Sequence, residues 1–403
     1  MKKNLENIYL TIFSLFCAVV PFTDLGEAIP NIILIVLVVL FPFVAQKHNW
    51  KKISDKRFYA LYVLVFLSTL QLVIFKRWED FKFVNRLLLV ILILILSIPI
   101  KNKLVPILSF IYGSLALLII SAINLVIHYM LSGQFNMTVG DHVSSILLGD
   151  RPYIGYVYVL SFCMCLYVAT QVSKTKFLYY SLALLFLIFI LIISARISLI
   201  SIIIGVLSYF FYAKNVKKVG LIIIILCFFS IIMFSINPSL KKRFFITDNN
   251  YSLEQMVKFE PRYFIWSCAN EIFFQNKNYI AGKGFVNTNN ELVNCYVNRI
   301  DFADEKQQDF FVRRKFNTHN QFINFLLSSG VLMFLIFIIF FVLWLKLDYK
   351  SYYSLILLLS LILFCSVENV LTRQMGGELF ALTLVFSTMV SFKVINNDNL
   401  LLK

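Results

Sequence analysis

The sequence predicts an all-α integral membrane protein of about twelve transmembrane helices, with one large, partly helical loop outside the membrane. Of its 403 residues, 60% are hydrophobic and only 14% are charged, whereas about a quarter of a soluble domain is charged. Many apolar runs approach or exceed the roughly 20 residues that cross a bilayer. A single polar stretch, 237–321, interrupts them and is too long for an ordinary connection.

Apolar runs of this length predict helices and not barrel strands. The first run follows Lys2 and Lys3, but no small-x-small cleavage site comes after it, so we interpret it as a span and not as a signal peptide. The predicted spans are Ile8–Phe22, Ile29–Ala45, Phe58–Phe75, Leu87–Ile100, Leu104–Leu131, Tyr153–Val172, Phe177–Ile193, Ile197–Ala213, Val219–Ile236, Phe322–Leu345, Tyr352–Val367 and Leu379–Phe392.

These spans divide the chain into three parts. We expect residues 1–236 to hold the first nine spans, residues 237–321 to form the large loop with active-site elements, and residues 322–403 to hold the last three spans and a cytoplasmic tail. Within the loop, apolar residues at helical spacing in "RYFIWSCANEIFF" (Tyr263, Trp266, Ile272 and Phe273) predict an amphipathic helix near the membrane surface, and "AGKGF" predicts a turn.

The net charge of +16 is interpreted as a topology signal. With the N-terminus in the cytoplasm, most Lys and Arg residues of the short loops lie on the cytoplasmic side, and the large loop lies outside. The loop from Lys76 to Arg86 argues against this orientation, although it also holds Glu79 and Asp80. No nucleic-acid motif is visible, so we expect the lipid bilayer, and no nucleic acid, as a partner.

Seven cysteines are scattered along the chain, and five of them lie in apolar runs. Cys268 and Cys295 share the large loop, and they can pair there if the loop lies outside the cytoplasm. The sequence leaves this pairing open. We expect no metal site, because the chain has no paired CxxC set and no carboxylate cluster.

A histidine precedes the tenth span, in "RRKFNTHNQFINFLLSSG". His319 lies where water meets lipid, just after the cations Arg313 and Arg314, and imidazole is suited to proton transfer near neutral pH. The ordinary alternative is a surface histidine at a helix start, with Thr318 as the N-cap and Asn320 as a polar residue of the first turn.

Several arginines are expected on the same face of the membrane. Arg196, in "LIISARISLIS", has hardly any loop around it, so it either snorkels to the interface or binds a phosphate group through its planar fork. Arg262, in "FEPRYFIW", either binds the same group or pairs with Glu260. Arg151, in "GDRPY", either joins them or pairs locally with Asp150.

The last outer loop, "ENVLTRQMGGE", carries Glu368 and Arg373 with the same ambiguity. Taken together, these residues predict an amphiphilic ligand with a lipid tail in the bilayer and a phosphate group at its surface. No Walker loop, GxSxG elbow or HExxH pattern accompanies them.

At these residues the chain resembles the O-antigen ligase and polymerase superfamily of bacterial envelope proteins. The resemblance covers nearly the whole chain in architecture. Its short motifs, in order, are the arginine after the seventh span (Arg196), R-x-x-x-W (Arg262 and Trp266), a Gly-x-Gly turn (Gly282 and Gly284), and H-N followed by a glycine (His319, Asn320 and Gly330). Met333 replaces a second glycine of some members, and His319 is the one histidine of the loop, which argues against a two-histidine mechanism.

The resemblance implies a metal-independent membrane glycosyltransferase of the GT-C type, without cofactors, in the bacterial inner membrane and with its active site facing the periplasm. The donor would be a glycan on undecaprenyl pyrophosphate, and the acceptor would be a sugar hydroxyl of lipid A–core in a ligase or another lipid-linked repeat in a polymerase. We expect His319, Arg196 and Arg262 to be catalytic. We expect the substrate to be bound by Arg151, Asn320, Arg313, Arg314 and Trp266.

Two readings from other classes stay open. One is a transporter of lipid-linked sugars, and the other is a non-catalytic partner in an envelope complex. Transporters tend to carry charged residues near mid-membrane and to show pseudo-repeats, whereas the cations here lie at span ends and in one loop. This distribution favours chemistry at the membrane surface.

Overall fold

The computed structural model describes residues 2–46, 49–50, 53, 55–133, 141–209, 212, 261–275, 279–299 and 305–391. Within these ranges the chain forms helices joined by turns and contains no strand. The predicted span Val219–Ile236, the first part of the large loop (237–260) and the C-terminal tail (392–403) lie outside the described residues. The division into three parts at 236 and 321 therefore stays a prediction.

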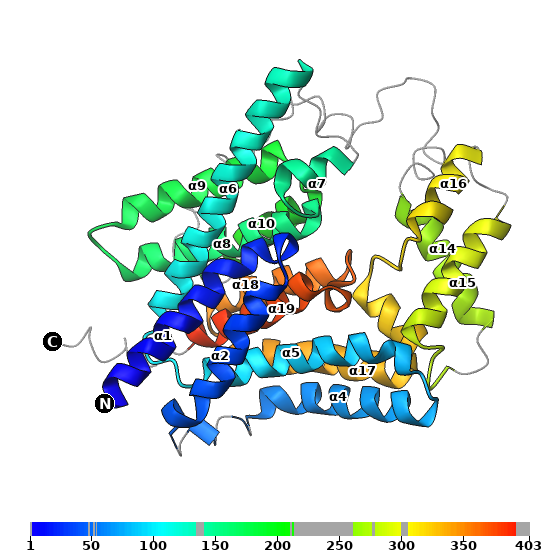
Figure 1. Cartoon of the computed structure of the whole chain (residues 1–403), viewed down its shortest axis with the longest axis horizontal. Coiled ribbons are helices and arrows are strands. Elements are labelled where there is room, and N and C mark those ends of the chain that lie inside the picture. The colour runs from blue at the N-terminus through cyan, green and yellow to red at the C-terminus, as the bar shows by residue number, and fades with distance from the viewer. Residues whose placement is uncertain are drawn as a thin grey trace.

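The helices are arranged as a bundle with a smaller group of helices at one end (Figure 1). In chain order they are α1 (Lys2–Val19), η1 (Val20–Leu25), α2 (Ala28–Val44), α4 (Lys56–Ile74), η2 (Trp78–Asp80), α5 (Phe81–Ser97), α6 (Leu104–Ser132), α7 (Asp141–Leu147), α8 (Arg151–Gln171), α9 (Lys176–Ile192), α10 (Arg196–Tyr209), α14 (Pro261–Gln275), α15 (Phe285–Asn298), α16 (Glu305–Arg314), α17 (Gln321–Asp348), α18 (Tyr352–Cys365), η3 (Val370–Thr372) and α19 (Gln374–Ser391).

Each predicted span that falls in the described ranges overlaps one of these helices, although the ends differ by up to six residues. Five segments are long and apolar enough to cross a membrane: Lys2–Leu25, Lys56–Ile74, Leu104–Ser132, Val143–Gln171 and Gln321–Asp348. Four further helices are apolar but shorter: Ala28–Val44, Lys176–Ile192, Arg196–Tyr209 and Tyr352–Cys365. The all-α membrane architecture is thereby supported, while the total of twelve spans stays a prediction.

Burial separates central helices from peripheral ones. The apolar window around α8 is 89% buried, and α19 buries nearly every side chain, whereas the windows of α4 and α6 are 33% and 44% buried. The peripheral helices expose large apolar side chains, such as Ile35 and Phe66. In water such surfaces would form a large apolar patch, but in lipid they are well solvated.

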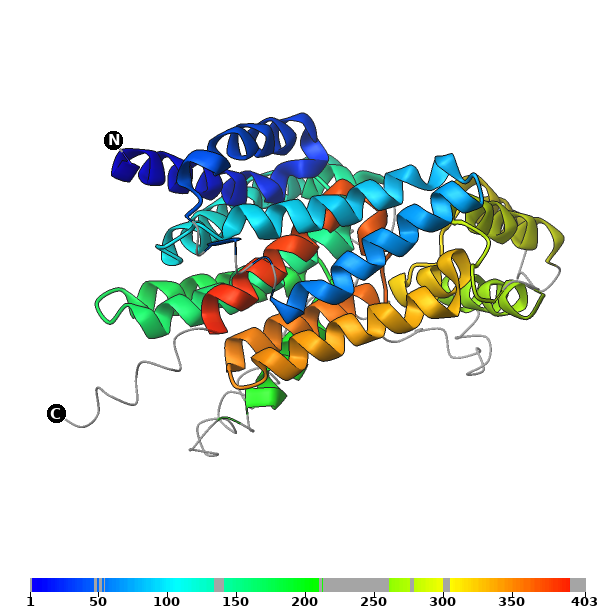
Figure 2. The ribbon, with the colours of Figure 1, turned by 90° about the horizontal axis from the view of Figure 1, so that it is seen from below.

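The short helices α14, α15 and α16 lie together at one end of the bundle, next to the ends of α4, α5 and α17 (Figures 1 and 2). We call this the loop end. The three helices share a small core of their own, to which α17 adds Leu327; its other members are Phe264, Ile265, Cys268, Ala269, Ile272, Leu292, Tyr296 and Phe311. The structure therefore confirms a helix at this position, and the helix packs against α15 and α16.

Its buried face matches the predicted one only in part, at Ile272. Tyr263 and Trp266 are each more than a third exposed, and the buried residues of α14 are Phe264, Ile265, Cys268, Ala269 and Ile272. Both sets of residues have helical spacing. The face that is buried in the structure is the one that also carries small residues. Cys268 and Ala269 allow α15 to approach closely, which the aromatic set would prevent.

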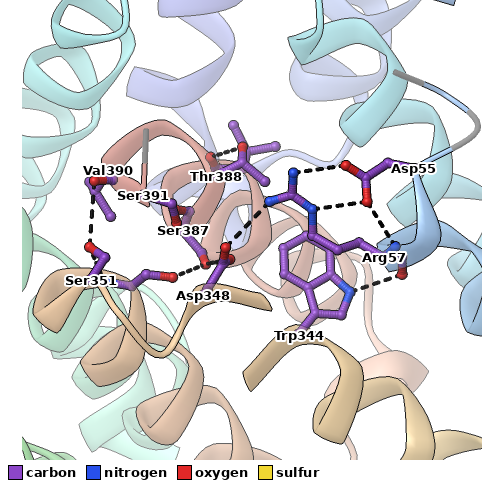
Figure 3. A network of polar contacts seen from close by, with 11 residues as sticks. Asp55, Arg57, Trp344, Asp348, Ser351, Ser387, Thr388, Val390 and Ser391 are labelled. Carbon is purple, nitrogen blue, oxygen red and sulfur yellow. Dashed lines mark hydrogen bonds and ion pairs between the residues drawn. The ribbon is translucent and has the colours of Figure 1, made fainter. Parts of the chain in front are cut away.

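At the opposite end of the bundle, a polar network joins α4, α17 and α19 (Figure 3). Arg57 pairs with Asp55 at 2.9 Å and with the buried Asp348 at 3.4 Å, and Ser387 donates to the second oxygen of Asp348 at 2.9 Å. The Trp344 indole donates to the Arg57 carbonyl at 3.2 Å. A buried carboxylate with these partners fixes three helix ends relative to one another.

Candidate active site

His319 lies in a tight turn directly before α17. Its backbone has a φ of +42°, and its N–H donates to the Asn317 side chain at 3.0 Å. The predicted N-cap, Thr318, is wrong: Asn320 caps α17 by accepting from the N–H groups of Phe322 and Ile323 at 2.9 and 3.1 Å. Thr318 lies two residues before the cap position, and its hydroxyl donates to the Asn369 side-chain oxygen at 2.9 Å.

Glu368 brings together the two predicted catalytic residues that come from the large loop. One carboxylate oxygen lies 3.1 Å from His319 Nδ1, and the other lies 3.6 Å from a terminal nitrogen of Arg262. That Arg262 nitrogen also donates to the Val367 carbonyl at 3.3 Å. The Glu368 side chain is 9% exposed, whereas those of His319 and Arg262 are 27% and 31% exposed. The cluster is thus anchored in the protein and open on one side.

Two further contacts hold the segments of this cluster in register. The Asn369 side-chain oxygen accepts from the Asn320 N–H at 2.8 Å, in addition to the Thr318 hydroxyl. The Trp266 indole donates to the Thr318 carbonyl at 3.0 Å and so attaches α14 to the histidine turn. Trp266, predicted as a substrate contact, therefore uses its only donor within the protein.

The arrangement defines what His319 can do chemically. An ionised carboxylate accepts hydrogen bonds only, so the proton of a neutral His319 ring is held on Nδ1, and Nε2 is left as a proton acceptor. The planar Arg262 guanidinium beside it can bind an anion. A base and a cation thus lie on two sides of one carboxylate.

Arg196 and Arg151 are linked to the Glu368 loop through the first turns of α8, because Tyr153 donates to the Asn369 carbonyl and Gly155 packs on Ala195. Arg196 begins α10 after a turn in which Ser194 has a φ of +55°, and Arg151 begins α8. Gly155 of α8 packs so tightly on this turn that a Cβ there would lie 2.8 Å from Ala195 Cβ. Both arginines are half-buried. The contacts of the Glu368 carboxylate that are described above include Arg262. They include neither Arg196 nor Arg151.

The first turn of α8 also reaches the Glu368 loop. The Tyr153 hydroxyl donates to the Asn369 carbonyl at 3.4 Å, and Arg373 lies over the Tyr153 ring, 5.3 Å from its centre. Arg373 pairs with Asp150, so the local pairing of Asp150 with Arg151 that we considered is not the ion pair formed. Burial alone would lower the pKa of Arg373, but the interactions with Asp150, Tyr153 and Asp24 together outweigh burial and raise that pKa.

Arg313 and Arg314 are exposed at the end of α16, shortly before His319 in the chain. The Arg313 Nε donates to the Asp309 carbonyl at 3.3 Å, and the Arg314 guanidinium lies 5.8 Å from the Phe310 ring centre. Their role in binding the substrate stays a prediction. The alternative partner of Arg262, Glu260, lies outside the described residues.

The glycines that were singled out in the sequence meet at a break in α17. Gly330 has φ +85° and ψ 175°, and a Cβ there would lie 2.0 Å from the Ile280 carbonyl oxygen. The turn 281–284 inserts into this break, where the N–H groups of Lys283 and Gly284 donate to Leu327 and Ser328 at 3.0 and 2.8 Å. Backbone groups that the break leaves without partners in α17 therefore form hydrogen bonds with the backbone of the loop.

Arg77 and Asp80, which sequence reasoning counted only as loop charges, fasten this turn. The Arg77 guanidinium donates to the carbonyls of Ala281 and Gly282 at 3.3 and 2.8 Å, and Asp80 accepts from the Val286 N–H at 3.0 Å. Burial lowers the pKa of Arg77 and raises that of Asp80. An acidic side chain at the N-terminus of α15 is favoured by the helix dipole.

In a comparison with known families, residues 160–338 match the family described as O-Antigen ligase. The matched segment contains Arg196, Arg262, Trp266, His319 and Gly330, and it ends before Glu368. No curated protein matches the chain. The family match supports the resemblance to the O-antigen ligase and polymerase superfamily.

Proposed function

We propose that this chain, which carries an O-antigen ligase family domain, moves a glycan from undecaprenyl pyrophosphate to a sugar hydroxyl of lipid A–core at the periplasmic face of the inner membrane. The observation that carries the proposal is the contact of Glu368 with both His319 and Arg262, at 3.1 and 3.6 Å. It joins a base and an anion-binding cation at the loop end of an apolar helix bundle.

The proposed reaction is a single displacement. His319 Nε2 takes the proton of the acceptor hydroxyl while the hydroxyl oxygen attacks the anomeric carbon. The glycosidic C–O bond breaks, and its electron pair leaves with undecaprenyl pyrophosphate, so the configuration at the anomeric carbon inverts. Arg262 and Arg196 bind the pyrophosphate and stabilise the charge that develops on it, and no metal is required.

The remaining predicted residues have supporting roles in this proposal. Arg151, Arg313 and Arg314 raise the positive potential that attracts the pyrophosphate. Asn320 and Trp266 act by positioning: Asn320 caps α17 directly after the base, and Trp266 fixes α14 to the histidine turn. Glu368 holds the His319 ring in the tautomer that leaves Nε2 as the acceptor.

The deciding experiment is glycan transfer by purified His319→Ala. We expect the rate to fall roughly 10²–10⁴-fold, because a general base contributes about that much. His128→Ala is the matched control, since His128 lies within α6 and should transfer glycan at the wild-type rate. Full transfer by folded His319→Ala would remove His319 from the reaction.

Deletion of the gene distinguishes the two activities of the superfamily. A ligase predicts that long glycan disappears from lipid A–core while lipid-linked polymer accumulates. Single repeat units on lipid A–core would instead identify a repeat-unit polymerase, which is the alternative to the ligase. Electrophoresis of the extracted surface polysaccharide makes the comparison.

A further inference from the structure

A cavity of about 360 Å³ lies between α14 and α15, apart from the His319 cluster. Its volume falls within the roughly 300–1,000 Å³ of small-molecule sites. Such sites are usually lined mainly by apolar side chains, but this cavity is lined largely by polar ones. The lining therefore favours a hydrophilic ligand.

The charges on the cavity wall balance one another. Glu271 and Glu291 contribute two carboxylates, and Lys283 and Arg299 contribute two cations. Lys283 and Glu291 form an ion pair with one another. A wall with this balance gives no strong preference for a phosphate or for a basic peptide, so it favours an uncharged ligand.

Three amide side chains complete the wall: Gln275, Asn294 and Asn298. An amide both donates and accepts hydrogen bonds, as a sugar hydroxyl does, and carboxylates accept from hydroxyl groups. Side chains of this kind are suited to a polyhydroxylated ligand.

The cavity is also built on a rigid frame. The disulfide Cys268–Cys295 joins α14 to α15, and Cys295 lies on the cavity wall. Lys283 belongs to the turn that inserts into the break in α17. A preorganised wall loses little conformational entropy when a ligand binds.

Helix α14 connects the cavity with the candidate active site. Arg262 is in its first turn, and Glu271 and Gln275 lie nine and thirteen residues later. At 1.5 Å per residue, these positions are about 14 and 20 Å along the helix from Arg262. A short oligosaccharide attached to a pyrophosphate at Arg262 could span this distance.

We propose that this cavity binds an oligosaccharide segment of the glycan, a few sugars away from the pyrophosphate. The inference rests on the proposed function for the identity of the glycan, and it adds a specificity site outside the reaction centre. The cavity would recognise the repeat unit after the lipid-linked end has been bound.

The test is a direct binding measurement. The wild-type protein in detergent is titrated with soluble oligosaccharide of the organism's own repeat unit, released by mild acid and free of lipid and pyrophosphate. We expect wild type and His319→Ala to bind it equally. Glu271→Gln combined with Asn294→Ala should bind about tenfold or more weakly, since each change removes hydrogen bonds to the ligand.

Asn289→Ala is the matched control, because Asn289 lies on α15, is exposed and does not line the cavity. An intact disulfide and a wild-type melting temperature would show that the double variant is folded. If the double variant is not folded, the single variant Asn294→Ala is measured in its place. Absence of binding by wild type, or unchanged binding by the folded variant, overturns the proposal. Glycan transfer is measured in parallel, so wild type that binds oligosaccharide without transferring glycan contradicts the proposed function and not the cavity.

Discussion

The carboxylate of Glu368 contacts an imidazole and a guanidinium at once, and it is mostly buried while both partners are partly open. A carboxylate in this place determines which ring nitrogen of His319 carries the proton. It also restrains Arg262 beside the ring. Both effects depend on the negative charge of Glu368 and on its two oxygens, so an uncharged replacement of the same shape separates charge from packing.

We predict that Glu368→Gln lowers kcat roughly 10²–10⁴-fold, because the amide can donate to Nδ1 and thereby favour the wrong tautomer. The KM for the donor should change much less, since Glu368 does not itself bind the donor in the proposed reaction. Steady-state glycan transfer with purified protein measures both constants.

Glu368→Asp keeps the negative charge, so its kcat should be higher than that of Glu368→Gln. A purely structural role of Glu368 would not require this difference between the two variants. A variant Glu368→Gln with wild-type kcat would show that the carboxylate has no part in positioning His319.

His319 and Arg262 were predictable because each has a local signal in the sequence: a polar cluster at a span boundary for His319, and a cation at the start of an amphipathic helix for Arg262. Glu368 had only an ambiguous signal. Its partner His319 lies 49 residues away, and no periodicity or local spacing reports a contact of that range. The roles of Arg196 and Arg151 stay predictions.

The break in α17 depends on a backbone conformation that only glycine adopts readily. At Gly330, φ is +85° and ψ is 175°, and the Ile280 carbonyl occupies the place of a Cβ. Gly330→Ala should therefore cost about 1–3 kcal/mol for the backbone alone and more for the clash. We expect a lower midpoint of thermal unfolding and loss of transfer.

Gly133→Ala provides the comparison, because Gly133 has a φ of +65° and a Cβ added there would meet no atom within 4 Å. It should lose only about 1–2 kcal/mol, the cost of the left-handed conformation. Equal effects of the two substitutions would mean that the contact between the turn 281–284 and α17 adds nothing.

The pair Cys268–Cys295, which the sequence left open, is a disulfide in the structure with a Cα–Cα separation of 5.9 Å. We predict that replacing both residues by serine lowers the stability of the α14–α15 unit by about 2–4 kcal/mol, as for other disulfides. Backbone amide hydrogen exchange in α14 and α15 should be faster in this variant than in the wild type, which would measure the lower stability. Alkylation of both thiols in the unreduced wild-type protein would contradict the pairing.

Helix positions were predictable because long apolar runs mark them, and each predicted span in the described residues overlaps a helix. The buried face of α14 was not predictable from the sequence, because aromatic and small residues both recur at helical spacing along this helix. Only packing against α15 selects the face that carries Cys268 and Ala269.

The bundle as a whole has two chemically different ends. The loop end carries α14–α16, the disulfide and the His319 cluster, and the opposite end carries the network of Arg57 and Asp348 (Figures 1 and 3). A stable disulfide is typical of an oxidising compartment. The positive-inside distribution of Lys and Arg predicts the same orientation from an independent property of the chain.

This orientation is tested by labelling introduced cysteines with a membrane-impermeant maleimide. Asn289, on α15 at the loop end, and Asn102, between α5 and α6, are both exposed. We predict that Asn289→Cys is labelled in cells whose inner membrane is intact, and that Asn102→Cys is labelled only after that membrane is permeabilised. The opposite result would put His319 in the cytoplasm, away from a donor that the proposed reaction uses at the periplasmic face. Because the described free cysteines Cys17, Cys163, Cys165 and Cys365 are buried, they add little background to either measurement.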